Sequence, residues 1–324
     1  MPKLLEIATE YAHLKCVESK PVMIAMAKLI QICGDKDIQD YDRKDARTFV
    51  DQYGKVKTTT IRRRLNSINA VFNWAAYELD LEQRNPFARL IIREEGRDAC
   101  ERQPFSENEL RNLYRRSLSF GKLRLILPIL GETGCRLSEV LGAVKKDILS
   151  VDGYLVLHVR ENSCRSLKTR GSDRQIPIVS SCAKQAVDRL LGACSDSDYL
   201  FPRYARDGHL NNTGASATLC KFLKASYGGK TTHCLRHSLR DRLRDADVPL
   251  EAIDQIGGWS SVGGAGSKYG RGYTTSKLAE YLCSISVDLS PAPQDYYPCL
   301  LTWDNTSVVC GMIVGEMRRL VLLV

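Results

Sequence analysis

The strongest folding signal in this 324-residue chain is an apolar stripe of helical period between Thr58 and Leu79. Apolar residues recur there at steps of three or four and define one helix face: Ile61, Leu65, Ile68, Phe72, Ala75 and Leu79. No convincing strand pattern precedes it, so the chain from Leu4 to about Leu90 is predicted to be helical throughout. Asn85-Pro86-Phe87 ends this half, because proline pushes the residue before it out of the helical region.

A polar, charge-dense stretch from Arg93 to Gln103 follows and is typical of a linker between domains. Beyond it, Ser106 and Glu109 predict a capped helix start. We therefore divide the chain into four parts: a helical domain over 1–92, a linker over 93–104, a second domain over 105–286 and an atypical tail over 287–324. The tail is turn-like and then apolar, which fits either a segment used in assembly or the product of a frameshift or of gene decay.

Strand signals occur only in the second domain. Tyr154 to Val159 is short and rich in β-branched and aromatic residues, and Gln175 to Ile178 resembles a returning strand. The polar segment between them, Arg160 to Arg174, is predicted to form a hairpin tip. The expected fold class is therefore mainly α with a small β-sheet or hairpin. Leu123 to Leu130 is predicted to be a buried helix with a bend at Pro128.

The composition indicates a globular protein and restricts its function only loosely. A net charge of +9 permits nucleic-acid binding without requiring it. The twelve cysteines are scattered with no C-x-x-C pair, which favours free thiols over a disulfide or zinc framework. The N-terminus lacks the apolar core of a signal peptide, and the apolar runs are too short to cross a bilayer. We therefore expect a cytoplasmic protein that does not act at a membrane.

Candidate site residues gather between Thr231 and Tyr269. His233 and Arg236 stand at the head of an amphipathic helix, Trp259 follows two glycines in a turn, and Tyr269 lies in a glycine-rich loop. An imidazole, a guanidinium, an indole donor and a phenol suit an oxyanion with a tyrosine beside it. No carboxylate cluster is present in this stretch to hold a metal ion.

Other residues allow two interpretations. Arg136 sits at a glycine-punctuated break between two apolar helices, where its guanidinium points into a cleft or forms an ion pair with Glu139. His233 and His237 have the i, i+4 spacing of a zinc pair, but no third ligand is near, so we interpret His237 as a structural residue packed behind the site. Three arginines face away from the apolar stripe: Arg62, Arg63 and Arg64. They form either a solvated charged surface or a set of contacts to DNA phosphates.

Taken in order, the motifs of this chain resemble the tyrosine recombinase family, most of all phage and prophage integrases. They are Thr-Gly-x-Arg-x-Ser-Glu from Thr133, Lys-Thr ahead of Ile-Pro, His-x-x-Arg-His from His233, Gly-Gly-Trp-Ser, and then Tyr. The resemblance covers about Thr58 to Leu282. It implies a helical, SAM-like core-binding domain followed by a mixed α/β catalytic domain, with the two clamping the DNA duplex.

The resemblance also implies a function and a role for each residue. The expected protein is a site-specific DNA recombinase that cleaves and rejoins DNA through a 3′-phosphotyrosyl intermediate, for integration or excision of a phage or mobile element. Arg136 and Arg236 would neutralise the phosphate, and Trp259 would donate its indole N–H to the same oxygens. His233 would be the general base, and Tyr269 the nucleophile. Lys168 would protonate the leaving 5′ oxygen, and Lys168 and Arg170 would contact DNA. No metal or other cofactor is expected.

The nucleophile has one competitor. Tyr273 shares the glycine-rich loop, but Tyr-Gly-Arg-Gly-Tyr resembles integrases in which the first tyrosine is used, which favours Tyr269. The expected partners are double-stranded DNA attachment sites, further copies of the chain in a homotetramer on DNA, and accessory DNA-bending proteins. Two other functions stay open: a catalytically inactive, DNA-binding prophage remnant, and strand passage of the type IB topoisomerase kind.

Overall fold

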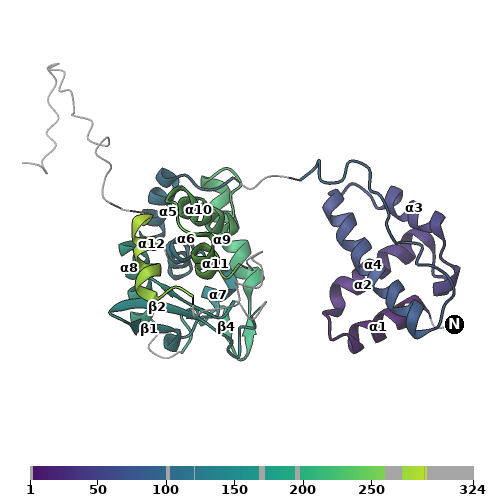
Figure 1. Ribbon diagram of the computed structural model, residues 1–324, viewed down its shortest axis with the longest axis horizontal. Helices are drawn as coiled ribbons and strands as arrows, with labels where there is room; N and C mark the ends of the chain where they lie inside the picture. The colour runs from purple at the N-terminus through teal and green to yellow at the C-terminus, as the bar shows by residue number, and fades with distance from the viewer. Residues whose placement is uncertain are drawn as a thin grey trace, which may run out of the picture. The chain divides into compact units, whose positions relative to one another are not determined.

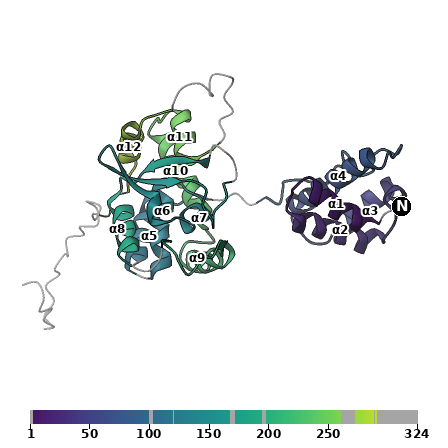
Figure 2. The same ribbon diagram turned by 90° about the horizontal axis from the view of Figure 1, so that it is seen from below.

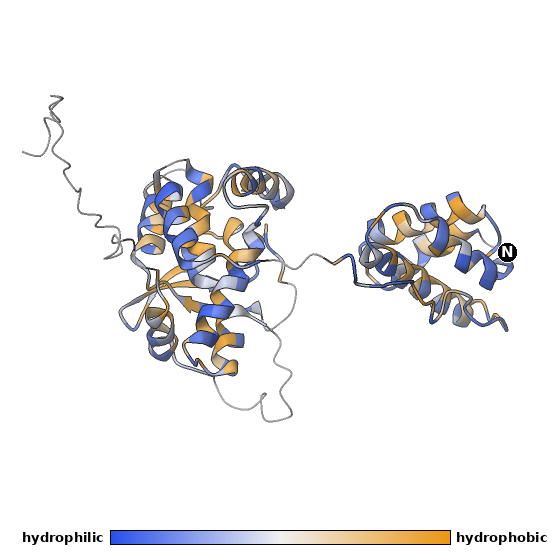
Figure 3. Cartoon of the chain, turned by 90° about the horizontal axis from the view of Figure 1, so that it is seen from above, coloured by the Kyte–Doolittle hydropathy of each residue, from blue (hydrophilic) through white to orange (hydrophobic). Residues whose placement is uncertain are grey.

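The computed structural model describes residues 3–99, 103–119, 121–167, 172–193, 198–259, 272–287 and 289. Contacts between residues divide the chain into two units, Met1–Arg102 and Gln103–Val324 (Figure 1). Each unit has its own hydrophobic core. In both, the helices carry a polar side and an apolar side, as the hydropathy colouring in Figure 3 shows. Each unit is therefore described by itself.

The first unit is helical over its described residues. Its elements are α1 (Leu4–Leu14), α2 (Ser19–Cys33), the 3₁₀ helix η1 (Ile38–Asp40), α3 (Arg43–Gln52) and α4 (Thr58–Glu78). The predicted stripe of α4 lies in the core: its first five members are buried and Leu79 packs against the core from just beyond the helix. The helical period of this segment thus predicted its inward face correctly.

The charge-dense stretch expected to be a linker makes contacts with α4. The Asp98 carboxylate accepts hydrogen bonds from the backbone N–H and the hydroxyl of Thr58, at 2.5 and 2.6 Å. Because Thr58 is the first residue of α4, Asp98 satisfies a backbone donor that the helix itself cannot. Arg62, one turn later, forms an ion pair of 2.6 Å with Glu95.

The second unit surrounds one central helix. In chain order its elements are α5 (Glu107–Ser119), η2 (Lys122–Leu125), α6 (Ile126–Thr133), α7 (Leu137–Leu141), η3 (Lys145–Asp147), β1 (Ile148–Val151), β2 (Tyr154–Val159), β3 (Arg174–Pro177), α8 (Ser181–Gly192), β4 (Ala205–Arg206), β5 (His209–Leu210), α9 (Asn212–Ser226), α10 (Thr232–Asp245), α11 (Leu250–Gly257) and α12 (Thr275–Ser284). Every residue of α6 is buried. The helix packs against α5, α7, α8 and α10, as Figures 1 and 2 show.

The sheet of this unit is small and antiparallel. Its strands lie in the order β1-β2-β3, and Val159 pairs with Arg174 at the end of the β2–β3 ladder. The predicted strand Tyr154 to Val159 is confirmed as β2, and the returning strand begins one residue earlier than predicted, at Arg174. Strand β1 was not predicted. The mainly helical fold class with small antiparallel sheets is confirmed.

The apolar segment around Pro128 differs from the prediction in one respect. A 3₁₀ helix, η2, leads directly into α6, and Pro128 lies in the first turn of α6. The N–H that proline lacks has no partner within a first helical turn, so Pro128 does not disrupt hydrogen bonding there. Among the helices that the structure describes, none is long and apolar enough to cross a membrane.

Candidate active site

A glycine turn presents Arg136. Helix α6 ends at Thr133, and Gly134 reverses the chain with a φ of +65°. A side chain at Gly134 would also collide with Leu239, whose Cδ2 lies 2.5 Å from the position of a Cβ. Arg136 is the N-cap residue of α7. Its side chain is 29% exposed, and its Nη1 donates to Glu139 Oε1 at 2.5 Å. The predicted break between two helices therefore exists, and Arg136 forms the ion pair with Glu139.

Arg236 reaches the same turn from the other side. It lies in the first turns of α10, where it is buried, and its Nη1 donates to the carbonyl of Gly134. Arg236 therefore bonds the turn that carries Arg136, although the two arginines lie 100 residues apart in the sequence. Glu139 supports that turn as well, because its Oε2 accepts the backbone N–H of Arg136 at 2.8 Å.

A third arginine, Arg174, belongs to this cluster and was not predicted. Its Nη2 lies 2.9 Å from Glu139 Oε2, and its side chain is 4% exposed. Its Nε donates to the carbonyl of Ile256 at 2.9 Å, and its Nη1 donates to that of Ser172 at 2.9 Å. The available signal was the alternation of β3, in which Arg174 shares the inward face with the buried Ile176.

The cluster carries more positive than negative charge. Three guanidiniums, those of Arg136, Arg174 and Arg236, surround the single carboxylate of Glu139. Burial, helped by the charges of Arg136 and Arg174, lowers the pKa of Arg236 to about 10. Burial raises the pKa of Glu139, but the charge of Arg174 and the hydrogen bonds from both arginines outweigh it, so the pKa is lowered. Arg136 is partly exposed and lies beside the buried charges of Arg174 and Arg236, so the cluster as a whole favours binding of an anion.

Trp259 contacts the cluster through its ring. The guanidinium carbon of Arg236 lies 4.1 Å from the ring centroid and that of Arg240 lies 4.7 Å from it, which is cation–π geometry. Both preceding glycines are required. A Cβ on Gly257 would lie 1.8 Å from the indole, and one on Gly258, where φ is +61°, would lie 2.8 Å from Arg174 Nη1. The Gly-Gly-Trp motif therefore seats the indole beside Arg236.

The two histidines lie on the outer side of α10. His233 and His237 are both exposed, and their rings meet edge to face with centroids 5.0 Å apart. The prediction that His237 packs behind the site was wrong: the inward positions of α10 are taken by Leu235, Leu239 and Leu243. Within the described residues, no group of three histidines, cysteines or carboxylates is arranged to hold a metal ion.

Three predicted site residues, Lys168, Arg170 and Tyr269, lie outside the described residues. The competitor Tyr273 is described and is half-buried. Its backbone N–H donates to Gln255 Oε1 at 2.8 Å, and its carbonyl accepts from Gln255 Nε2 at 3.0 Å. Its ring packs edge to face on Tyr281. Tyr273 is therefore fixed at both its backbone and its ring.

The arginines at the start of α4 have unequal surroundings. Arg63 is exposed. Arg62 is paired with Glu95, and its Nη2 also donates to the carbonyl of Leu90 at 2.9 Å. Arg64 Nη1 lies 3.4 Å from the carbonyl of Pro21.

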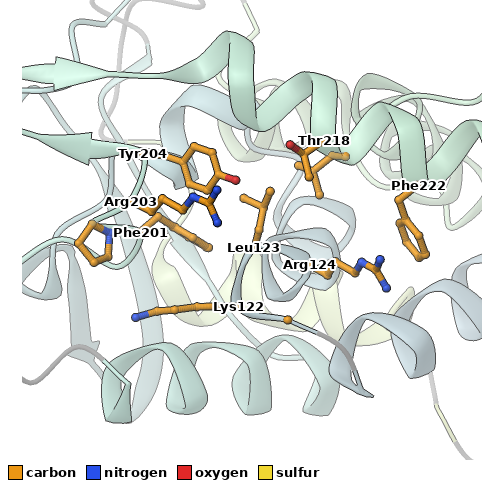
Figure 4. A pocket seen from close by; sticks show the side chains of 11 residues that line it. Lys122, Leu123, Arg124, Phe201, Arg203, Tyr204, Thr218 and Phe222 are labelled. Carbon is orange, nitrogen blue, oxygen red and sulfur yellow. The ribbon is translucent and has the colours of Figure 1, made fainter.

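A separate pocket of about 360 Å³ lies between η2, the turn after Phe201 and α9 (Figure 4). Its lining is mostly apolar, with Arg124 stacked on Phe222 at 4.1 Å. No member of the arginine cluster lines it. This pocket is therefore separate from the arginine cluster.

Comparison with known proteins adds sequence and fold relationships. The sequence model of the phage integrase family matches residues 101–274. No curated protein sequence matches the chain. Among solved structures, the chain is similar to the Tn1549 transposon integrase in complex with transposon right end DNA, at 18% identity and a TM-score of 0.63, over 86% of this chain and 98% of that one.

It is also similar to two structures of lambda integrase. One is a tetramer bound to a Holliday junction, at 17% identity and a TM-score of 0.59, over 81% of this chain and 78% of that one. The other is a dimer bound to a COC′ core site, with the same identity and TM-score, over 80% of this chain and 96% of that one. At these identities the likeness establishes the fold.

Proposed function

The chain belongs to the phage integrase family of tyrosine recombinases, and on that premise we propose that it is a site-specific DNA recombinase acting through a 3′-phosphotyrosyl intermediate. Its role would be the integration or excision of a phage or other mobile element. The observation that carries the proposal is the arginine cluster, in which three guanidiniums share one carboxylate beside an indole.

A DNA phosphodiester fits this cluster chemically. Its negative charge repels a nucleophile, and guanidiniums neutralise the nonbridging oxygens with paired, permanently charged donors. Arg136 is the most exposed of the three arginines and contacts the phosphate, while the buried Arg236, stacked on Trp259, adds positive charge beside it. Because these arginines supply the positive charge, the proposed reaction needs no metal ion.

The proposed reaction moves two protons and exchanges one ester for another. The phenol oxygen of Tyr269 attacks phosphorus, His233 accepts the phenol proton, and the bond to the 5′ oxygen breaks as Lys168 protonates that oxygen. Attack by the 5′ hydroxyl of a second strand then releases the tyrosine. His233 is suitably exposed in the first turn of α10. The double anchoring of Tyr273 by Gln255 supports Tyr269 as the nucleophile.

The proposed partners follow from the same chemistry. The helical first unit is proposed as a core-binding domain whose α4 contacts the DNA backbone through Arg62, Arg63 and Arg64, joined in the catalytic domain by Lys168 and Arg170. The likeness to a lambda integrase tetramer on a Holliday junction supports a homotetramer on paired attachment sites. Accessory DNA-bending proteins and a cytoplasmic location on DNA complete the proposal. The domain boundaries proposed remain 1–92, 105–286 and a tail over 287–324.

A two-site assay tests this function. DNA carrying both flanks of the gene is incubated with the protein and examined for recombinant products, with binding measured in parallel. The wild type is expected to yield recombinants, and Arg236→Ala is expected to bind DNA without forming them. The matched control is Arg244→Ala, an exposed arginine of the same helix α10, which should recombine normally.

Two results would contradict the proposal. Relaxation of supercoiled DNA without any dependence on a second site would indicate strand passage of the topoisomerase kind. Binding of the flanking DNA by the wild type with neither recombinants nor cleaved strands would indicate a binding protein without turnover.

A further inference from the structure

Arg174 links segments that lie far apart in the sequence. One guanidinium contacts the carboxylate of Glu139 in α7, the carbonyl of Ile256 in the last turn of α11, and the carbonyl of Ser172 before β3, each at 2.9 Å. The side chain is 4% exposed. Each of its three nitrogens thus contacts another group of the protein.

Two of these contacts, to Glu139 and to Ile256, connect Arg174 indirectly to Arg136 and Arg236, the two arginines proposed to bind phosphate. Glu139 receives Arg174 on Oε2 and Arg136 on Oε1, so one carboxylate fixes both side chains. Ile256 stands three residues before Trp259, whose ring lies on Arg236. Between them, Gly258 passes so close to Arg174 that a single added carbon would collide with Nη1.

We propose that Arg174 is a positioning residue for DNA cleavage, holding Arg136 through Glu139 and Arg236 through the turn that carries Trp259. The proposal rests on the recombinase function proposed above. Lysine cannot replace arginine in this role, because only a planar guanidinium offers donors in several fixed directions at once.

Removing Arg174 also has an electrostatic consequence that a purely structural residue would not have. The charged or titratable groups that face Glu139 are Arg136, Arg174, Arg236 and Cys135. Burial raises the pKa of the Cys135 thiol, so the thiol stays neutral, and the arginines stay charged at neutral pH. Without Arg174, burial of Glu139 is opposed by Arg136 and Arg236 only, and the carboxylate becomes easier to protonate. A protonated Glu139 no longer holds Arg136.

The test measures the rate of single-turnover cleavage of pre-bound, nicked DNA over a range of about pH 5–9. A raised pKa of the Glu139 carboxyl would change the cleavage rate within this range. Arg174→Met is expected to slow cleavage at neutral pH by about 10²-fold, the usual effect of misplaced catalytic groups, with little change in DNA affinity. It should also gain a second acid limb, in addition to the one that protonation of the general base His233 gives every variant, since Glu139 now titrates. The double variant Arg174→Met, Glu139→Gln should lose that limb while remaining slow.

Arg242→Met is the matched control. Arg242, whose side chain is 16% exposed, likewise joins a carboxylate, Glu132 at 3.1 Å, to two backbone carbonyls, but it lies outside the cluster. It should lower thermal stability as Arg174→Met does and leave the pH profile unchanged. Arg174→Lys keeps a charge near Glu139, so its pH profile should match that of the wild type while its rate falls. It is the variant to use if Arg174→Met does not fold.

Two outcomes would overturn the proposal. One is a folded Arg174→Met or Arg174→Lys variant that cleaves at the wild-type rate. The other is a slow Arg174→Met whose pH profile matches that of Arg242→Met. Failure of the recombinase function would be visible separately, because the wild-type protein itself would then cleave no DNA.

Discussion

Replacing Glu139 by glutamine removes the carboxylate that Arg136 and Arg174 share. Glu139 is 5% exposed and pairs with Arg136 at 2.5 Å and with the buried Arg174 at 2.9 Å. Removing one partner of a buried ion pair costs about 3–5 kcal/mol, because the remaining charge stays buried without compensation. The positive charge left behind includes Arg236, whose pKa burial already lowers to about 10.

The loss should be visible in thermal unfolding. In a domain of this size each kcal/mol shifts the melting temperature by about 2–4 °C, so Glu139→Gln should lower the Tm of the second unit by about 6–20 °C. The assay is calorimetry of the full chain, with Glu280→Gln as the matched control. Glu280 has the same i, i+3 relation to its partner Lys277, but both are exposed, and such pairs contribute about 0–1 kcal/mol.

The pH dependence has a defined sign. The folded-state pKa of Glu139 is lowered, so its contribution to stability is present above the unfolded pKa of about 4.3 and is lost as pH falls through the folded value. Glu139→Gln should therefore reduce the acid-side loss of stability relative to the wild type. If Glu139→Gln lowers the Tm no more than Glu280→Gln does, Glu139 is not the counter-charge of this cluster.

Three further changes test other parts of the account. DNA affinity should fall steeply and linearly on a log–log plot as salt rises, because phosphate contacts release counterions, and a flat dependence in a binding titration would argue against DNA as the partner. Trp259→Phe keeps a ring over Arg236 but loses the indole N–H, so single-turnover cleavage should slow by about 10²-fold, and an unchanged rate would exclude the N–H as a phosphate donor. Gln255→Ala removes both hydrogen bonds to the backbone of Tyr273 and should slow cleavage without weakening DNA binding. Equal cleavage rates for Gln255→Ala and the exposed control Glu251→Ala would show that these hydrogen bonds do not contribute to cleavage.

Local signals predicted much of this structure. The helical period of α4 identified its buried face, and β-branched and aromatic residues identified β2. The glycines before Arg136 and Trp259 predicted turns correctly, since a positive φ is a property of one residue and its immediate neighbours. These features depend on contacts within a few residues, which a sequence displays directly.

Two kinds of feature were not predicted: those defined by residues far away in the sequence, and those whose local sequence signal was not used. Arg174 is defined by Glu139 and Ile256, which lie 35 and 82 residues away in the chain. No local pattern distinguishes such an arginine from a surface one. Strand β1, in contrast, had a signal: Asp152 and Gly153 both have positive φ and close the β1–β2 hairpin, and Asp-Gly is a preferred pair for such turns. The exposure of His237 followed from which side of α10 packs on the core, which the i, i+4 spacing does not reveal.

Covalent capture of DNA tests the central claim most directly. Nicked or supercoiled DNA from the flanks of the gene is incubated with the wild type, Tyr269→Phe and Tyr273→Phe, and the products are separated on a denaturing gel. We predict a protein–DNA adduct with the wild type and with Tyr273→Phe, and none with Tyr269→Phe. Loss of the adduct only in Tyr273→Phe would keep the chemistry and reassign the nucleophile. No adduct from the wild type, on DNA that it demonstrably binds, would contradict the claim that this protein cleaves DNA through a tyrosine.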